Sequence, residues 1–181
     1  QRAGGELKKG LAHGPQIAGA NVVKLLKCLR ANGAVPSSVK DPVWKYKWVQ
    51  SHEPGNFART DMWLDVKEYL LLRCTGRAVM TEDSAYATLL YDTKKRAWSE
   101  SLCRMFGVNM DHLPPVIQSV DRAGGLTDRA AVELGLVPGT PVFGGGGDAS
   151  LIGIGAGAAA VGSTHIYCGT SGWVSTVTDR Q

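Results

Sequence analysis

Several signatures of common functional classes are absent from this sequence of 181 residues. No apolar run reaches the roughly 18–20 residues that cross a bilayer, and the first ten residues lack the apolar core of a signal peptide. The four cysteines are far apart and form no C-x-x-C pair, and the four histidines are equally scattered. This spacing argues against both a metal site and a disulfide framework. We therefore expect a soluble, cytoplasmic protein.

Two families of nucleotide enzymes are also excluded by missing motifs. There is no GxxxxGK[ST] segment, which the phosphate-binding loop of P-loop NTPases requires. The HRD and DFG elements of protein kinases are absent as well. Any nucleotide chemistry must therefore use another fold.

The net charge of +4 is local rather than spread over the chain, because residues 1–30 hold six basic side chains and one acidic one. A basic arm of this kind can contact nucleic acid or an anionic surface. A solvated helix face beside a frayed terminus is the more ordinary explanation. We favour it, and we expect neither nucleic acid nor a membrane among the partners.

Helices and strands alternate along the sequence, which predicts an α/β fold. Start and stop signals predict helices at Ala20–Asn32, Pro42–His52, Val66–Cys74, Glu100–Phe106 and Asp128–Leu134, and a small-residue helix at Ala149–Ala160. Extended segments are expected at Met62–Leu64, Ala78–Met80, Thr88–Tyr91, Pro141–Phe143, His165–Cys168 and Trp173–Val177. Trp44 and Trp48 share a helix face, and we expect them to pack in the interior.

The run Gly144–Gly147 and Asp148 lies between an expected strand and an expected helix. Glycine lets the backbone approach a ligand closely, and a helix amino terminus favours an anion. A carboxylate held there can accept a proton from a hydroxyl group, or hold Mg²⁺ directly or through water. An ordinary glycine-rich turn with Asp148 as the helix N-cap is equally compatible.

A dinucleotide-binding interpretation of the same segment is weaker. Gly144, Gly146 and Ala149 fit a relaxed G-x-G-x-x-A pattern. The acidic residue expected about 20 positions later is missing, since the next acid after Asp148 is Asp179. An oxidoreductase is therefore a distant alternative.

A second glycine-bounded turn, Gly169, Thr170, Ser171 and Gly172, joins the last two expected strands. Its backbone N–H groups and two hydroxyl groups could form a nest for phosphate oxygens. An ordinary hairpin turn would have the same composition. Together with Asp148, this turn points to phosphoryl transfer, which needs mainly positioning and charge neutralisation.

These motifs lie within a broader resemblance over roughly residues 20–178. In order, the segments that carry it are KYKWVQSHEPGNFART, WLDVKEYLLLRCTGR, SAYATLLYD, WSESLCRMFGV, LPPV, GGLTDRAAVELGLVPGTPVFGGGGD and CGTSGW. The sequence is similar to the FGGY carbohydrate kinases, and within them to the xylulokinase-like branch. The resemblance implies an actin-like, ribonuclease-H-like ATPase fold of two domains with a cleft between them.

The resemblance also implies a site. ATP and Mg²⁺ would be the cofactors and a sugar or polyol the substrate. Asp148 matches the family's catalytic base and could hold the metal through water, with Gly147 and Ala149 beside the substrate. The second-domain phosphate loop matches Gly169, Thr170, Ser171 and Gly172. Two further matching acids, Asp83 and Asp92, are expected to be structural, capping or turn residues.

Two departures from the family pattern bear on function. Xylulokinases often carry Asn after the catalytic aspartate, where this chain has Ala149, so xylulose itself is in question. The amino-terminal D-x-G-T motif and the carboxy-terminal adenosine-binding segment have no counterpart here. We expect residues 1–157 to be the later part of the sugar-binding domain and 158–181 the start of the nucleotide-binding domain. The boundary would fall near Ala156 to Gly162.

An isolated chain of this kind is expected to have little kinase activity, because phosphoryl transfer depends on all the phosphate contacts acting together. A non-catalytic remnant of the kinase fold that binds sugar or a partner is the main alternative, and a homodimer stays open. An actin-like ATPase without a sugar substrate is a second alternative.

Overall fold

The structure is a computed structural model that describes residues 9, 11–17, 20–36, 38–169 and 171–179. These residues form two compact units that divide between Gly144 and Gly145. We call the part up to Gly144 the core unit and the part from Gly145 onward the hairpin unit. The predicted domain boundary near Ala156 to Gly162 stays a prediction, because a compact unit is not by itself a domain.

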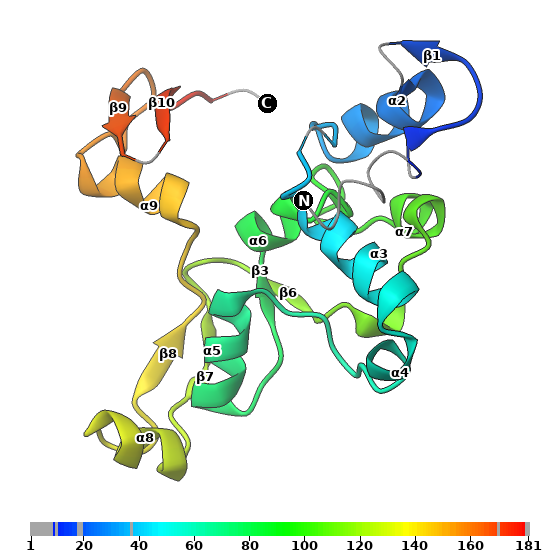
Figure 1. The fold of residues 1–181 in the computed structure, drawn as a ribbon. Helices are drawn as coiled ribbons and strands as arrows, with labels where there is room; N and C mark the ends of the chain where they lie inside the picture. Colours follow the sequence, from blue (N-terminus) through cyan, green and yellow to red (C-terminus); the bar gives the residue numbers. More distant parts are fainter. Residues whose placement is uncertain (1–8, 10, 18–19, 37, 170, 180–181) are drawn as a thin grey trace. The chain divides into compact units, whose positions relative to one another are not determined.

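Helices and strands alternate through both units (Figure 1). The helices of the core unit are α2 (Val22–Ala31), α3 (Pro42–His52), α4 (Pro54–Phe57), α5 (Val66–Thr75), α6 (Glu82–Ala87), α7 (Glu100–Phe106), the 3₁₀ helix η1 (Met110–His112) and α8 (Asp128–Leu134). Its strands are β1 (Gln16–Ile17), β2 (Ala20–Asn21), β3 (Met80–Thr81), β4 (Tyr91–Asp92), β5 (Ala97–Trp98), β6 (Val116–Ile117), β7 (Arg122–Gly125) and β8 (Pro141–Phe143). The hairpin unit contains α9 (Asp148–Gly155), β9 (Thr164–Cys168) and β10 (Gly172–Thr176).

The main hydrophobic cluster of the core unit lies among α2, α3 and α7. Cys28, Trp44, Leu102 and Phe106 are buried in it. The Trp44 and Phe106 rings meet edge to face, with centroids 5.4 Å apart. The prediction that Trp44 packs inside is confirmed, whereas Trp48 stacks on His52 on the helix surface, with ring centroids 4.8 Å apart.

Two pairs of strands, β3 with β6 and β7 with β8, precede the glycine run. Strand β3 pairs in parallel with β6, and β7 pairs antiparallel with β8 across an irregularity between Arg122 and Gly124. Helix α5 lies along β7 (Figure 1). Gly124 permits this contact, because a Cβ atom there would lie 2.8 Å from Cβ of Thr75 at the end of α5.

Most helix boundaries agree with the predicted capping signals. Asp65, Ser99 and Thr127 each accept a backbone N–H bond at a helix start. The glycines that follow those three helices, at positions 76, 107 and 135, have the positive φ of a left-handed helix stop. Glycine tolerates this conformation because it has no Cβ.

Some predicted elements are wrong. Met62–Leu64 is irregular rather than a strand, and the Trp63 N–H donates to the His112 carbonyl group at 2.7 Å. The extended segment expected at Thr88–Tyr91 begins with the end of the unpredicted helix α6, and Leu89 has a φ of +66°. The small-residue helix ends at Gly155, earlier than expected. Strand β8 is confirmed, but it is not buried, since Phe143 is 56% exposed.

The four cysteines are free thiols. Burial raises the pKa of Cys28 and of Cys103 to about 11, whereas Cys168 in β9 is exposed. Within the described ranges, no three His, Cys, Asp or Glu side chains are grouped so that they could hold a metal ion. None of the helices that the structure describes combines the length and hydrophobicity needed to cross a membrane.

Candidate active site

The glycine run leaves the core unit through a tight passage at Gly144. Its N–H donates to the Asp121 carbonyl group at 2.9 Å. A Cβ atom at this position would lie 2.7 Å from Cγ2 of Thr81 and 2.9 Å from the Gln118 carbonyl oxygen. Only glycine fits this passage without displacing its neighbours, which explains the first glycine of the run.

Asp148 is the first residue of α9 and is exposed. The N-cap is Gly147, with φ −67° and ψ 153°, so Asp148 is a first-turn residue and not the N-cap. Its Oδ1 accepts the N–H of Ala149 at 2.8 Å. The backbone of Asp148 is thus fixed at the start of a helix, while its side chain is open to solvent. A group that must reach a substrate requires both. Ala149, also exposed, contributes only a methyl group.

The predicted phosphate loop is the turn of the β9–β10 hairpin. Gly172 pairs with Cys168, so residues 169–171 form the connection. The Gly169 N–H donates to the Ser171 carbonyl group at 2.9 Å and therefore closes the turn. Ser171 is exposed. Thr170 lies outside the described residues.

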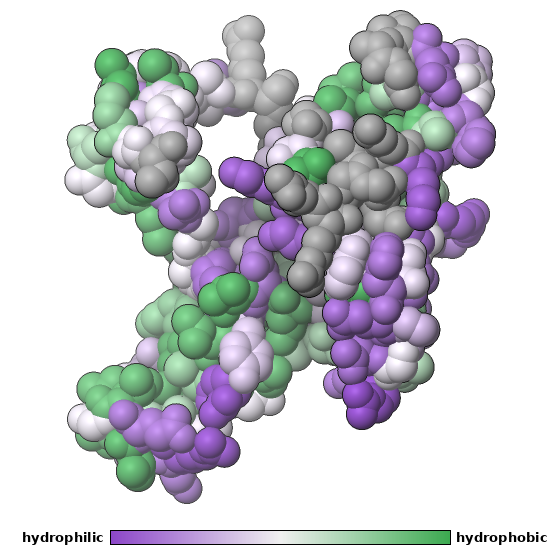
Figure 2. Space-filling view, in the orientation of Figure 1, coloured by the Kyte–Doolittle hydropathy of each residue, from purple (hydrophilic) through white to green (hydrophobic). Residues whose placement is uncertain are grey.

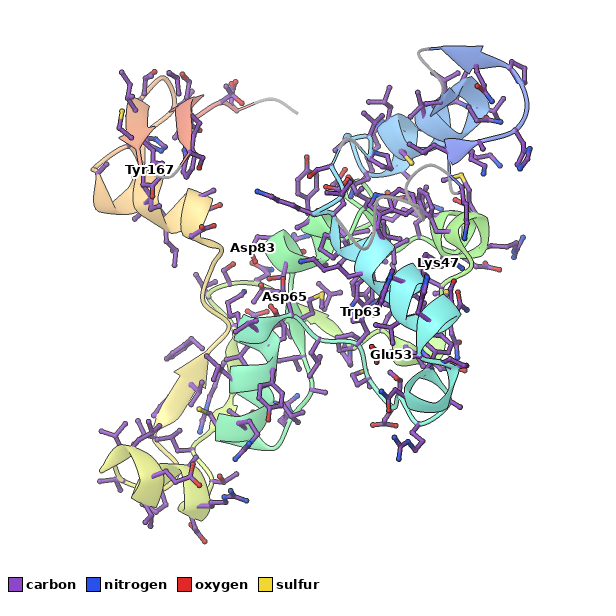
Figure 3. All side chains as sticks on the ribbon, viewed as in Figure 1. Lys47, Glu53, Trp63, Asp65, Asp83 and Tyr167 are labelled. Carbon is purple, nitrogen blue, oxygen red and sulfur yellow. The ribbon has the colours of Figure 1, made fainter. Side chains whose placement is uncertain are left out.

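An aromatic pair supports this loop. Tyr167 and Trp173 are cross-strand partners, and their rings stack with centroids 4.0 Å apart. Figure 3 labels Tyr167 at the end of the hairpin that meets α9. Trp173 therefore packs beside the loop, with Tyr167 as its partner. Asp148 and the loop belong to the same compact unit.

Sequence reasoning missed a polar network in the core unit, next to the passage at Gly144. The Glu68 side chain is completely buried, and Lys67 Nζ lies 3.2 Å from its Oε1 and 3.5 Å from Oδ1 of Asp83. The Thr81 hydroxyl group lies between the two carboxylates and hydrogen-bonds to Asp83. Acidic side chains are rarely buried completely unless they are paired, and loss of the partner is destabilising. The adjacent Lys67 and Glu68 in α5 were the signal in the sequence, but nothing there shows that Thr81 and Asp83 join them.

The two family-matching aspartates have structural contacts, as expected. Asp83 belongs to the network just described, and Figure 3 labels it at the start of α6. Asp92 accepts the backbone N–H groups of Lys94 and Lys95 at 3.1 and 3.0 Å, and so holds the turn between β4 and β5.

A small apolar pocket of about 140 Å³ lies elsewhere in the core unit, beside α3 and α4. Its walls include Tyr46, Phe57 and Trp63, and Lys45 and Thr60 also line it. The Tyr46 hydroxyl group is within 2.9 Å of Nδ1 of His112, and burial raises the pKa of Tyr46. These aromatic residues therefore pack against one another. None of the described residues that line the pocket supplies a carboxylate for acid–base chemistry.

Comparison with known proteins identifies the family to which this chain is similar. Residues 24–155 match the model of the FGGY family of carbohydrate kinases, N-terminal domain. A xylulose kinase of Bacillus subtilis is 37% identical over 128 residues, which are 71% of this chain and 26% of that protein. A xylulose kinase of Staphylococcus epidermidis is 35% identical over 133 residues, which are 74% and 27% of the two proteins. The chain thus spans about a quarter of the length of these relatives.

Solved structures agree with this result. A xylulose kinase from Brucella ovis superposes with a TM-score of 0.74 at 28% identity, covering 82% of this chain and 31% of that one. A xylulose kinase from Rhodospirillum rubrum gives a TM-score of 0.81 at 22% identity, covering 96% and 34%. With the α/β alternation described above, these findings mean that the chain belongs to the FGGY family of carbohydrate kinases, in its xylulokinase-like branch, and has part of the actin-like ATPase fold.

Proposed function

We propose that this chain is part of an ATP-dependent kinase that phosphorylates a hydroxyl group of a sugar or polyol, with Asp148 as the general base. The observation that supports this most is the setting of Asp148, which is exposed at the start of α9 and belongs to the same compact unit as the hairpin loop. The names of the similar proteins support the reaction class, since several are xylulose kinases.

In the proposed reaction, the Asp148 carboxylate accepts the proton of the attacking sugar hydroxyl group, and that oxygen forms the new bond to the γ-phosphorus. The bond from the γ-phosphorus to the oxygen that bridges it to the β-phosphate breaks at the same time, and ADP leaves with that electron pair. The helix-start backbone limits where the carboxylate can move, so the base is positioned before the substrate arrives. The glycine run leaves room for the substrate, because no side chains project from positions 145 to 147.

The hairpin loop would hold the phosphate groups of the nucleotide. Because the Gly169 N–H already closes the turn, we assign the phosphate contacts of the described residues to the Ser171 hydroxyl group and the backbone around Gly172. A hydroxyl group and backbone amides suit phosphate oxygens because they donate hydrogen bonds to the negatively charged oxygens.

The donor set also fits a nucleotide-bound Mg²⁺ ion. Mg²⁺ typically takes one or two carboxylates and keeps water and phosphate oxygens as its remaining ligands. Asp148 offers one exposed carboxylate, which could contact the ion directly or through water. When bound, the ion would neutralise negative charge on the transferred phosphoryl group.

Ala149 bears on which sugar is used. Its methyl group cannot donate or accept the hydrogen bonds that an Asn amide at this position would make. We therefore propose a sugar or polyol acceptor without committing to xylulose. The cytoplasmic location, a possible homodimer, and the absence of nucleic-acid and membrane partners all stay predictions.

The test is Asp148→Asn in a complete protein that contains this chain. Loss of the base should lower turnover by about 10²–10⁴-fold and leave ATP binding nearly unchanged, because Asn keeps the size but cannot accept the proton. Turnover is measured as sugar-dependent ADP release, and ATP binding by calorimetry. The isolated chain should show little of this activity.

Asp128→Asn is the matched control, because Asp128 is also an exposed first residue of a helix, α8. It should leave turnover within about twofold of the unmodified enzyme, as surface substitutions usually do. Near-normal turnover in Asp148→Asn would overturn the proposal. Sugar binding without any phosphorylation by the complete protein would favour the non-catalytic alternative.

A further inference from the structure

A histidine of strand β9 contacts a glycine of α9. His165 and Tyr167 are half-buried, whereas Ile166 between them is 71% exposed. Side chains alternate along a strand, so His165 and Tyr167 point to the same face. Gly153 is the buried residue of α9, and a Cβ atom there would lie 2.9 Å from Cε1 and 3.3 Å from Nδ1 of His165. The imidazole ring thus occupies the space where a side chain on Gly153 would be.

The chain reversal after α9 makes this contact possible. Helix α9 ends with the Ala158 N–H bonded to the Gly153 carbonyl group at 2.9 Å, and Gly157 has a φ of +81°. The positive φ turns the chain back along the helix, as glycine allows. The strands are then tied at their open end, where Gly162 N–H donates to the Val177 carbonyl group at 2.8 Å. His165 is therefore held on a strand whose two ends are fixed.

A second contact between a ring and a glycine lies at the other end of the same face. A Cβ atom on Gly169 would lie 2.7 Å from Cζ of Tyr167, so the tyrosine ring leans over the first residue of the hairpin loop. Trp173 stacks on Tyr167, with a ring-plane angle of 26°. A series of two ring–glycine contacts on one face of β9, at His165 and at Tyr167, therefore links the strand to α9, which begins at Asp148, and to the loop.

The polarity of His165 does not explain its place in this series. Both ring nitrogens are buried, and neither has a hydrogen-bond partner within the part of the chain that the structure describes. A buried polar group without a partner costs free energy, so stability alone would favour an apolar side chain here. What the ring provides is a rigid, flat spacer between β9 and the backbone of α9.

We propose that His165 is a positioning residue that, through its contact with Gly153, sets the separation between Asp148 and the Gly169–Gly172 loop. This inference rests on the proposed function. The base and the phosphate donor must be aligned in the transition state, and a displacement of about 1 Å can cost on the order of 10²-fold in rate. The contact affects alignment rather than the binding of either substrate alone, so its loss should appear in kcat and not in KM.

Two opposite changes test the contact in the complete kinase. Gly153→Ala places a methyl group against the ring and pushes β9 away, and His165→Ala removes the ring and lets β9 approach. Each should lower kcat by about tenfold or more, because either displacement misaligns base and phosphate. The KM for ATP and the KM for the sugar should stay within about threefold, because neither change removes a substrate contact. In the double variant Gly153→Ala/His165→Ala, the new methyl group takes part of the vacated space, and kcat should recover to within about threefold of the original enzyme.

Ile166→Ala is the matched control, because it truncates the neighbouring side chain on the outward face and should leave kcat unchanged. All rates are referred to the folded fraction, measured by circular dichroism. If Gly153→Ala does not fold, His165→Asn shortens the spacer with less disturbance and should show the same separation of kcat from KM.

Unchanged kcat in the His165 variants, a change confined to KM, or a double variant as slow as the slower single variant would each overturn the inference. Asp148→Asn separates this failure from failure of the proposed function. If Asp148→Asn is inactive while His165→Ala is fully active, only the role of His165 is wrong. If Asp148→Asn is active, the proposed function itself is wrong.

Discussion

The core unit and the hairpin unit differ in how many large side chains each of them buries. The core unit buries large side chains such as Trp44, Leu90 and Leu102 almost completely. The hairpin unit has only Gly153 and Ala158 as buried positions among its described residues, and it exposes Ile166 and Val174. Figure 2 shows this hydrophobic surface over the hairpin. The predicted base and phosphate loop thus belong to the unit with fewer buried side chains among its described residues.

The largest expected effect is the difference in unfolding free energy between one substitution in the core unit and one in the hairpin unit. Leu102→Ala should lower the free energy of unfolding by about 3 kcal/mol, because it removes a fully buried side chain and leaves a cavity. Ile166→Ala should cost less than about 0.5 kcal/mol, because that side chain is already exposed. Urea unfolding followed by circular dichroism measures both. Equal losses would mean that Ile166 is covered in solution, which would contradict the comparison.

An intermediate effect concerns the polar network beside Gly144. Lys67→Met leaves the Glu68 carboxylate buried without its cation and should cost about 2 kcal/mol of unfolding free energy. Adding Glu68→Gln should recover at least half of this loss, because the neutral amide needs no cation. The measurement is again urea unfolding, with the exposed Lys94→Met as a control of the same chemistry. A double variant as unstable as Lys67→Met alone would show that the network is held by something other than charge.

The smallest expected effect is a pH dependence within the core unit. The Arg96 guanidinium group forms two hydrogen bonds to Glu82, at 2.8 and 2.9 Å, and these hold the pKa of the carboxyl group below its usual value. A lowered carboxyl pKa contributes stability above the unfolded-state value of about 4.3, and this contribution is lost as the pH falls through the folded-state pKa.

The stability difference between the unmodified chain and Glu82→Gln should therefore be constant above about pH 5 and shrink below about pH 4. Melting temperatures across this pH range measure it. In an Arg96→Met background the same comparison should lose most of its pH dependence, because the main cause of the pKa shift is gone. A pH dependence that survives in this background would assign the shift to another group.

Local sequence signals predicted the helices well, because a capping side chain and a terminal glycine act within one turn. Asp65 and Gly76 around α5 are an example, and both act as expected. Helix α6 was not predicted, because it has only six residues and lies between two segments that were expected to be extended. The segment at Met62–Leu64 has an apolar pattern, but its backbone bond to His112 depends on residues about 50 positions away.

In the candidate site, too, local features could be predicted from the sequence, and contacts between distant segments could not. Asp148 and the hairpin loop could be located from the sequence, because glycines mark both turns. The packing of His165 on Gly153 and the network around Thr81 could not, because each joins segments that are distant in the sequence. The glycine at position 153 is ambiguous in the sequence, since it is one of several small residues in α9, and only the structure shows which of them faces a ring.

The different surroundings of the cysteines have a practical consequence. Thiol-reactive dyes couple to the thiolate form, and a buried thiol with a pKa of about 11, as in Cys28 and Cys103, stays protonated and shielded at neutral pH. Cys168 is exposed and lies one residue before the hairpin loop. A fluorescent maleimide should therefore attach there in preference to the two buried thiols. The sequence thus carries its own attachment point for an optical reporter, next to the loop that is proposed to bind a nucleotide phosphate.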